Sequence, residues 1–177
     1  MTKLINVINS IAKDEYVLLF VQFEDLMVIV SRALAAADIS HRMARQTNPA
    51  AIRDFTKPTA AKPRPKVLML QLGSAMAAGL NLQCANHVIF LSPLHAPTQH
   101  DYEAGMTQAI GRVRRFGQEK SVHVYHMLVP QTAEVNIYQG RHGGLLVQRD
   151  DRLVVVPTAT RQAADLLLEG PPLTWAQ

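Results

Sequence analysis

Two arginines and a glutamine in the second half of the chain have the types and spacing that bind anions. Gln108, Arg112 and Arg115 are four and three residues apart. Successive residues of a helix turn by about 100°, so a helix would bring these three side chains to one face. Each guanidinium is planar and offers five N–H donors, which suit the forked hydrogen bonds that a phosphate accepts. The spacing therefore predicts a site for an anion such as a nucleotide phosphate.

The helix that carries these residues is expected to begin just after Thr98. Thr98, with Asp101 three residues later, forms a typical helix N-cap, and Pro97 precedes it. A stripe of apolar residues has the same helical spacing and lies about a third of a turn from the arginines. The members of this stripe are Tyr102, Met106, Ala109, Val113 and Phe116. We expect the helix to bury this stripe and to keep both guanidinium groups along one edge.

Strands and helices alternate along the rest of the first 140 residues. Short apolar runs predict buried strands at residues 16–21, 67–72 and 87–91, and residues 122–129 are expected to form a fourth strand. Helical patterns cover residues 24–37, 49–55 and 132–138, besides the helix that follows Thr98. Residues 57–65 contain three prolines, which exclude a helix or a central strand there. The alternation predicts an α/β fold with a parallel sheet and right-handed crossovers.

The pattern changes after Gly140. Residues 144–156 are typical of a hairpin that turns at Asp150–Asp151, and residues 158–169 of a further helix. We therefore expect two domains, residues 1–140 as the α/β core and residues 141–177 as a small C-terminal hairpin–helix appendage.

Composition limits the class of protein. Of the 177 residues, 48% are hydrophobic and 18% charged, which is typical of a globular chain. No apolar run reaches the roughly 18 residues of a membrane span, and the N-terminus is unlike a signal peptide. The single cysteine, Cys84, excludes an internal disulfide and a cysteine-based zinc site, and we expect no metal bound by this chain. A soluble, intracellular protein that does not contact membranes is expected.

The positive charge of the chain is concentrated in one segment. Residues 41–66 contain seven lysines and arginines, Arg42 and Arg45 among them, but only one acidic residue, Asp54. Such an excess can attract nucleic-acid phosphates, although a solvated loop without a partner is an equally good interpretation. Residues 73–81 form a second candidate, because their small side chains would let backbone amides approach a ligand or another chain. Ordinary turn chemistry would produce the same composition.

Four segments, in this order, resemble the C-terminal RecA-like lobe of superfamily two helicases, and among them the Swi/Snf-type DNA translocases. Ala78-Gly-Leu-Asn-Leu-Gln-Cys-Ala-Asn-His-Val-Ile-Phe90 resembles the fifth helicase motif, and Gln108-Ala-Ile-Gly-Arg-Val-Arg-Arg-Phe-Gly-Gln118 resembles the sixth. Residues 17–23 are similar to the strand of the fourth motif, and residues 122–128 to the strand after the sixth. The resemblance implies a three-layer RecA-like parallel sheet of the P-loop NTPase type, as the second lobe of a motor.

The resemblance also implies roles for individual residues. Arg112 and Arg115 match arginine fingers that reach the γ-phosphate of ATP bound by a first lobe, and Gln108 matches a polar residue of the same interface. Gly79 and Asn81 match positions that shape the fifth-motif loop and border the nucleotide. An alternative for Asn81 is that its side chain only caps the turn.

Contacts with double-stranded DNA are implied as well. The expected residues are Ser74 in the loop, Gln22 after the first strand, and Arg42 and Arg45 in the basic segment. The family implies a nuclear location and chromatin remodelling. Three departures from its pattern, at Met76–Ala77, Ser92 and His95–Pro97, affect the DNA contact and the loop path and leave the arginines intact.

The sequence lacks two parts that ATP hydrolysis needs. It contains no Gly-x-x-x-x-Gly-Lys-Ser/Thr loop to hold the β- and γ-phosphates, and no Asp-Glu box at a strand end to hold Mg²⁺. ATP and Mg²⁺ would be held by a first lobe, supplied by another chain or by sequence outside these residues. We therefore expect no ATPase activity from this chain alone. The alternative hypothesis is a non-catalytic, nucleic-acid-binding or interaction remnant of the helicase fold.

Overall fold

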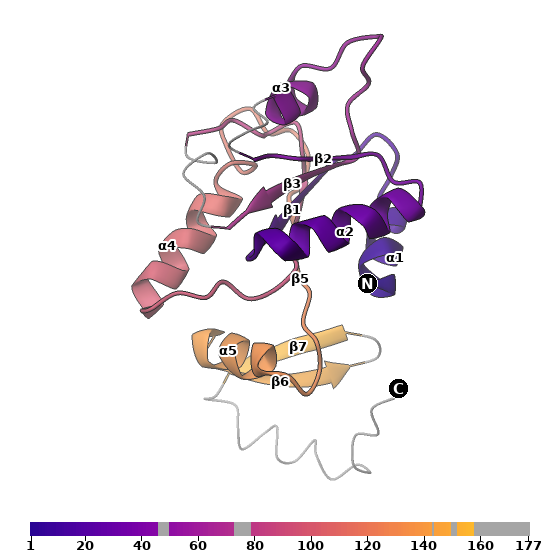
Figure 1. Cartoon of the computed structure of the whole chain (residues 1–177). Coiled ribbons are helices and arrows are strands. Elements are labelled where there is room, and N and C mark those ends of the chain that lie inside the picture. The colour runs from indigo at the N-terminus through magenta and orange to yellow at the C-terminus, as the bar shows by residue number, and fades with distance from the viewer. Residues whose placement is uncertain (46–49, 73–78, 143, 150–151, 158–177) are drawn as a thin grey trace. The chain divides into compact units, whose positions relative to one another are not determined.

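The computed structural model describes residues 1–45, 50–72, 79–142, 144–149 and 152–157, with side chains up to residue 142 (Figure 1). These residues belong to two compact units, residues 1–128 and residues 129–177, which are considered separately below. The expected domain boundary after residue 140 stays a prediction.

The first unit is built on a parallel sheet of five strands in the order β2-β3-β1-β4-β5. The strands are β1 (Val17–Val21), β2 (His41–Met43), β3 (Val67–Gln71), β4 (His87–Phe90) and β5 (His123–His126). All four neighbouring pairs are parallel. In the central strand, Val17 is in register with Val67 on one side and His87 on the other.

The central strand is apolar throughout because both faces of the sheet are covered. Every residue of β1 is buried. Successive side chains of a strand point to opposite faces. Leu18 and Phe20 accordingly belong to one core, whereas Val17, Leu19 and Val21 belong to the other.

Four helices cover the two faces of this sheet. The core that contains Val17 includes residues of α1 (Thr2–Ser10) and α2 (Glu24–Ala36), among them Leu4, Ile8, Met27, Val30 and Leu34. The core that contains Leu18 includes residues of α3 (Ala50–Thr56) and α4 (Gln99–Ile110), among them Phe55, Tyr102 and Met106. Helices, sheet and helices therefore form three layers, and the predicted α/β class is confirmed.

Helix α4 begins where its cap was predicted but ends before the arginines. Thr98 Oγ1 accepts a hydrogen bond from the Asp101 amide (3.1 Å), which fixes the first turn. The helix stops at Ile110, with Gly111 as its C-cap. Val113 is still buried as expected, but Phe116 is fully exposed. The predicted apolar stripe thus breaks down after Val113, because the chain leaves the helical path.

Two elements were not predicted. Helix α1 packs through Leu4 and Ile8, and β2 is a three-residue edge strand of polar character. Residues 57–65 form no helix or strand, as their prolines predict, and contain one isolated bridge between Thr59 and Lys62.

The second unit contains α5 (Ala133–His142) and an antiparallel hairpin. The hairpin strands are β6 (Gly144–Arg149) and β7 (Arg152–Pro157), so the predicted hairpin is present. Its turn at Asp150–Asp151 and the helix expected at residues 158–169 lie outside the described residues.

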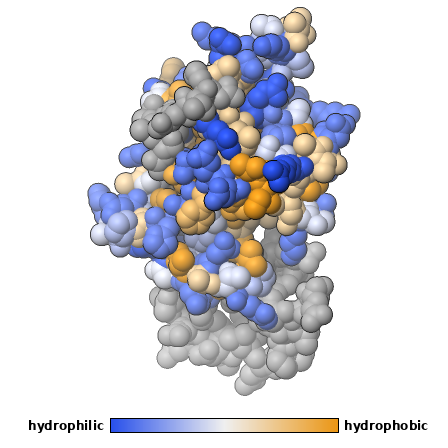
Figure 2. Space-filling view, viewed as in Figure 1, coloured by the Kyte–Doolittle hydropathy of each residue, from blue (hydrophilic) through white to orange (hydrophobic). Residues whose placement is uncertain are grey.

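On the face shown in Figure 2, hydrophobic side chains form small groups between hydrophilic ones. Within the described part of the chain, none of the helices combines the length and apolar character that a membrane crossing requires.

Candidate phosphate-binding turn

Residues 111–118, which we call the arginine turn, follow α4 directly. The amides of Val113 and Arg114 both donate to Ile110 O (3.0 and 2.9 Å), so the helical hydrogen bonding tightens and ends there. Gly117 has a φ of +94°, in the left-handed region that favours glycine. Gln108 lies in the last turn of α4, and Arg112 and Arg115 lie beyond it. The expectation that one continuous helix carries all three is therefore wrong.

Arg112 is the most unusual side chain of this turn. Its Nε and Nη1 atoms are buried, and neither has a hydrogen-bond partner in the described part of the chain. Burial lowers the pKa of Arg112, but a guanidinium in a protein remains protonated. A partly desolvated cation with two unpaired donors is unfavourable by itself, and an anion would relieve this cost.

Arg115 and Gln108 differ from Arg112 in that both are exposed to solvent. Arg114 is exposed as well, and neither Arg114 nor Arg115 forms an ion pair with a residue that the structure describes. The turn thus presents one half-buried and two exposed guanidinium groups.

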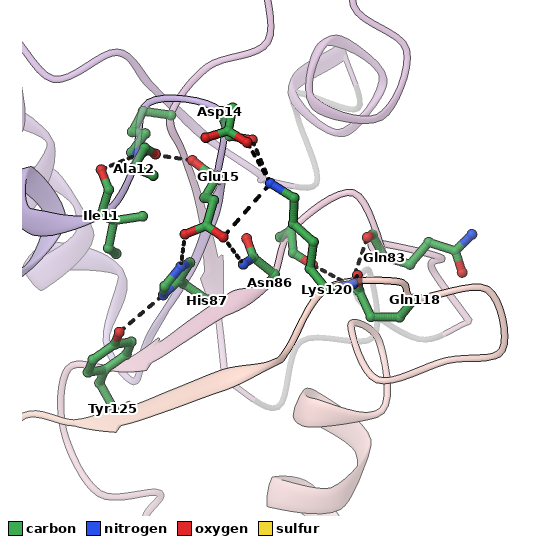
Figure 3. A network of polar contacts seen from close by, with 12 residues as sticks. Ile11, Ala12, Asp14, Glu15, Gln83, Asn86, His87, Gln118, Lys120 and Tyr125 are labelled. Atoms are coloured by element: carbon green, nitrogen blue, oxygen red, sulfur yellow. Dashed lines mark hydrogen bonds and ion pairs between the residues drawn. The ribbon is translucent and has the colours of Figure 1, made fainter.

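The arginine turn is bonded to residues 79–86, the segment that leads into β4. Leu82 N donates to Arg112 O (3.0 Å). The Gln118 side-chain amide donates to Gln83 O (2.9 Å), as Figure 3 shows, and to Ala85 O (2.8 Å). These bonds make the arginine turn and the segment that resembles the fifth motif neighbours in the fold.

Gly79 and Asn81 shape that segment locally. Gly79 has a φ of +75°, and Asn81 Oδ1 accepts a hydrogen bond from Gln83 N (3.2 Å). Asn81 therefore caps its own turn, which is the local role left open above. Ser74, Met76 and Ala77 lie outside the described residues.

The arginine turn lies toward the amino ends of the strands. Helix α4 returns from the end of β4 to the start of β5, and its C-terminal extension is bonded to Ala85, two residues before β4 begins. Gln22 lies at the opposite, carboxyl edge, where its side-chain oxygen accepts from His95 N (3.3 Å) and its carbonyl from Gln71 Nε2 (3.4 Å). The structure thus separates Gln22 from the arginines.

The basic segment is largely engaged within the fold. Arg42 Nε lies 3.8 Å from Asp54 Oδ2, and Arg45 Nε lies 3.2 Å from Glu24 Oε1 without hydrogen-bond alignment. Arg64 donates to a backbone carbonyl and stacks over the ring of Tyr16. The Lys66 ammonium donates to three carbonyls at the α1–β1 connection, those of Ile11, Ala12 and Glu15. Exposed basic residues remain at Arg53, Lys57 and Lys62.

A second polar cluster lies at the amino edge of the sheet and was not foreseen from the sequence (Figure 3). We call it the amino-edge network; its members are Asp14, Glu15, Asn86, His87, Lys120 and Tyr125. Glu15 Oε1 accepts from Asn86 Nδ2, and Glu15 Oε2 pairs with His87 Nε2, both at 2.8 Å. His87 Nδ1 lies 3.1 Å from the Tyr125 hydroxyl. A neutral imidazole that donates from Nε2 and accepts at Nδ1 satisfies both contacts.

Lys120 connects this network to the arginine turn. Its ammonium pairs with Asp14 Oδ2 at 2.7 Å, which raises the pKa of Lys120 and lowers that of Asp14. Its backbone amide donates to Gln118 Oε1 (3.0 Å). Among the described residues, no group of three or more histidine, cysteine or carboxylate side chains could hold a metal ion.

Comparison with known proteins gives the class. Residues 1–117 match the family described as helicase conserved C-terminal domain, and the chain belongs to that family. The structure is similar to the C-terminal part of the Fun30 ATPase domain, with a TM-score of 0.64 and 23% identity, over 95% of this chain and 52% of that one.

Within this class the chain is a Swi/Snf-type C-terminal lobe. It is 41% identical over 150 residues to a DNA (cytosine-5-)-methyltransferase DMT5 of Cryptococcus neoformans, which is 83% of this chain and 6% of the relative. It is 33% identical over 128 residues to the DNA repair protein rad8 of Schizosaccharomyces pombe, which is 70% of this chain and 10% of that protein. The chain thus spans a small fraction of these curated relatives.

Proposed function

We propose that this chain is the second motor lobe of a DNA-dependent ATPase and supplies arginine fingers to a nucleotide bound by a first lobe. The observation that supports this most directly is Arg112, whose buried Nε and Nη1 donors have no partner. Phosphate oxygens are strong acceptors for guanidinium donors. The resemblance of residues 108–118 to the sixth helicase motif supports the same role for Arg112 and Arg115.

In this proposal the residues of the chain bind and orient, and they transfer no atoms. ATP, held with Mg²⁺ by the first lobe, supplies the phosphoryl group that is transferred to water. Arg112 would donate forked hydrogen bonds to it from a partly desolvated position, where charge stabilisation is stronger than in water. Arg115, being exposed, would complete the contact only when the first lobe docks. Gln108, Gly79 and Asn81 would border the same interface.

Double-stranded DNA is the nucleic acid we propose, because the curated relatives are named as DNA repair and DNA methyltransferase proteins. We also propose a nuclear location and a role on chromatin, which the family resemblance implies. We propose that DNA contacts Gln22, Ser74, Arg42 and Arg45. Since Arg42 and Arg45 pair with acids of the chain, DNA would have to compete for them.

The proposal is tested by joining the chain to a first lobe that carries the phosphate-binding loop. We expect ATP hydrolysis that DNA stimulates. Arg112→Ala should lower kcat by about 10³-fold or more, the range known for arginine fingers. Arg115→Ala should also lower kcat, and Arg114→Ala, an exposed neighbour, serves as the matched control.

Two outcomes would refute the proposal. One is normal turnover in both Arg112→Ala and Arg115→Ala, which would remove the finger role. The other is the absence of hydrolysis by the joined protein together with salt-sensitive, nucleotide-independent DNA binding by the chain. That second result would favour a non-catalytic DNA-binding domain.

A further inference from the structure

The Gln118 side chain forms several hydrogen bonds within the chain that neither the proposed phosphate contact nor the proposed DNA contact explains. We propose that Gln118 is a positioning residue, which sets the direction of Arg112 by clamping the arginine turn to residues 82–85. This inference depends on the proposed function for its catalytic consequence, and on the structure alone for the clamp itself.

Both the nitrogen and the oxygen of the Gln118 side-chain amide form hydrogen bonds. Its Nε2 donates to Gln83 O (2.9 Å) and Ala85 O (2.8 Å), with Val113 O at 3.4 Å, and its Oε1 accepts from Lys120 N (3.0 Å). An amide group has two donor hydrogens, and both have close carbonyl acceptors here. The side chain is half-buried, so these bonds are partly shielded from competing water.

The clamp closes a ring of contacts around Arg112. On one side Leu82 N donates to Arg112 O, and on the other Gln118 bonds to Gln83 and Ala85. Val113, which follows Arg112, is completely buried. The backbone of Arg112 is therefore fixed from both directions.

The backbone matters here because few hydrogen bonds orient this guanidinium. The Nε and Nη1 atoms of Arg112 have no hydrogen-bond partner among the residues that the structure describes, so no hydrogen bond from those residues fixes their direction. Their direction depends on the path of the arginine turn, and that path depends on the seam between residues 82–85 and residues 112–118. A small displacement of a catalytic group lowers turnover strongly.

Three substitutions of Gln118 distinguish the effect of its hydrogen bonds from the effect of its packing. Gln118→Leu keeps the volume and removes every bond, whereas Gln118→Glu keeps an acceptor for Lys120 N but directs a carboxylate at two carbonyl oxygens. Gln118→Asn keeps the amide on a shorter side chain and provides a milder variant. Glu119→Gln, at the exposed neighbouring position, is the matched control.

The catalytic consequence is measured in the protein joined to its first lobe. Gln118→Leu should lower kcat about tenfold or more while KM for ATP changes little, as for an interaction that acts in the transition state. In the Arg112→Ala background the same substitution should change kcat less than about twofold, because Gln118 acts through Arg112. Equal fold-changes in both backgrounds would overturn the positioning role.

The clamp itself is measured on the 177-residue chain without nucleotide. Gln118→Leu should speed hydrogen exchange of the Leu82 amide about tenfold or more relative to β1 amides, and Gln118→Asn should speed it by a smaller factor. Unchanged exchange at Leu82 in both variants would overturn the clamp. If the joined wild-type protein does not hydrolyse ATP, the proposed function fails, and this exchange measurement still decides the clamp.

Discussion

The two polar clusters of the first unit differ in how completely their hydrogen bonds are satisfied. In the amino-edge network, Glu15, Asn86, His87 and Lys120 all find partners within the chain. In the arginine turn, two buried donors of Arg112 find none. Lys120 belongs to the amino-edge network and Gln118 to the arginine turn. The hydrogen bond between these two residues makes the two clusters neighbours in the fold.

The difference indicates what each cluster contributes. A buried polar group with all its bonds made adds a modest amount to stability, and loss of one partner exposes the full cost of desolvation. We therefore expect the amino-edge network to contribute to the stability of the fold. Unpaired donors of a partly desolvated cation oppose folding, and under the proposed function a phosphate would satisfy them. Four measurements would sharpen or break this contrast.

The largest expected effect follows from removing a member of the satisfied cluster. Asn86 is buried, and its side chain donates to Glu15. Asn86→Leu should lower the free energy of unfolding by about 1–3 kcal/mol, because Glu15 loses a donor. Urea denaturation measures this change. Asn6→Leu, at an exposed position of α1, should stay within about 0.5 kcal/mol, and an equal loss in both variants would show that the network has no special role.

The next effect concerns the backbone of the arginine turn. Gly117 has a φ of +94°, and an added Cβ would approach Gln83 only to 3.6 Å, an ordinary contact. Gly117→Ala should therefore cost about 1–2 kcal/mol from its backbone conformation alone. Gly117→Asn should cost less, since asparagine tolerates the left-handed region better. Equal losses in thermal unfolding for the two variants would point to packing as the cause.

We expect the free energy of unfolding to depend on pH because of His87. Burial, with a smaller opposing effect from Glu15, lowers the pKa of His87 below its ordinary value of 6.5. The unfolded chain then binds more protons near that value, so stability should fall as the pH drops from about 7.5 to 5, by at most about 1.4 kcal/mol per pH unit for one proton.

The pH dependence of stability is caused by His87 if a substitution of His87 removes it. The pKa of Glu15 is also lowered, chiefly by its hydrogen bond from His87, so Glu15 loses its contribution only at more acid pH. His87→Gln should flatten the slope of unfolding free energy between pH 5 and 7.5. His100→Gln, an exposed histidine of α4, should keep it, and an unchanged slope in His87→Gln would reject the assignment.

The smallest effect is expected at the unsatisfied cluster. Arg112→Met removes the unpaired donors and keeps much of the volume, so the free energy of unfolding of the chain alone should stay constant or rise by no more than about 1 kcal/mol. Arg114→Met, exposed and outside the buried part of the turn, is the control. A loss of more than about 1 kcal/mol in Arg112→Met would mean that Arg112 has a structural partner.

The layers of the fold could be predicted because burial is periodic in the sequence. The apolar runs that became β1, β3 and β4, and the cap at Thr98, are local signals. Strand β2 has no such signal, since its three residues are only partly buried or exposed at a sheet edge. Helix α1 offered two buried residues, Leu4 and Ile8, four positions apart, which a helical interpretation of the N-terminus could have used.

The backbone path of the candidate site was not predicted correctly, and its role as a phosphate site stays a prediction. The spacing of Gln108, Arg112 and Arg115 fits a helix, yet α4 ends at Ile110 and the bonds to Leu82, Gln83 and Ala85 determine the turn instead. The amino-edge network joins residues more than 70 positions apart, such as Glu15 and Asn86. No local pattern can report contacts of that range, because they depend on how the strands align.

Cys84 lies inside the segment that Gln118 holds. The thiol is half-buried, its Sγ lies 3.8 Å from Phe55 O, and burial raises its pKa. A thiol of raised pKa reacts slowly with alkylating reagents, because the thiolate is the reactive form. Since the sequence contains no other cysteine, the alkylation rate of the unmodified protein reports how often the seam beside the arginine turn opens. The chain thus carries its own chemical probe beside the arginine turn, where the proposed first lobe would dock.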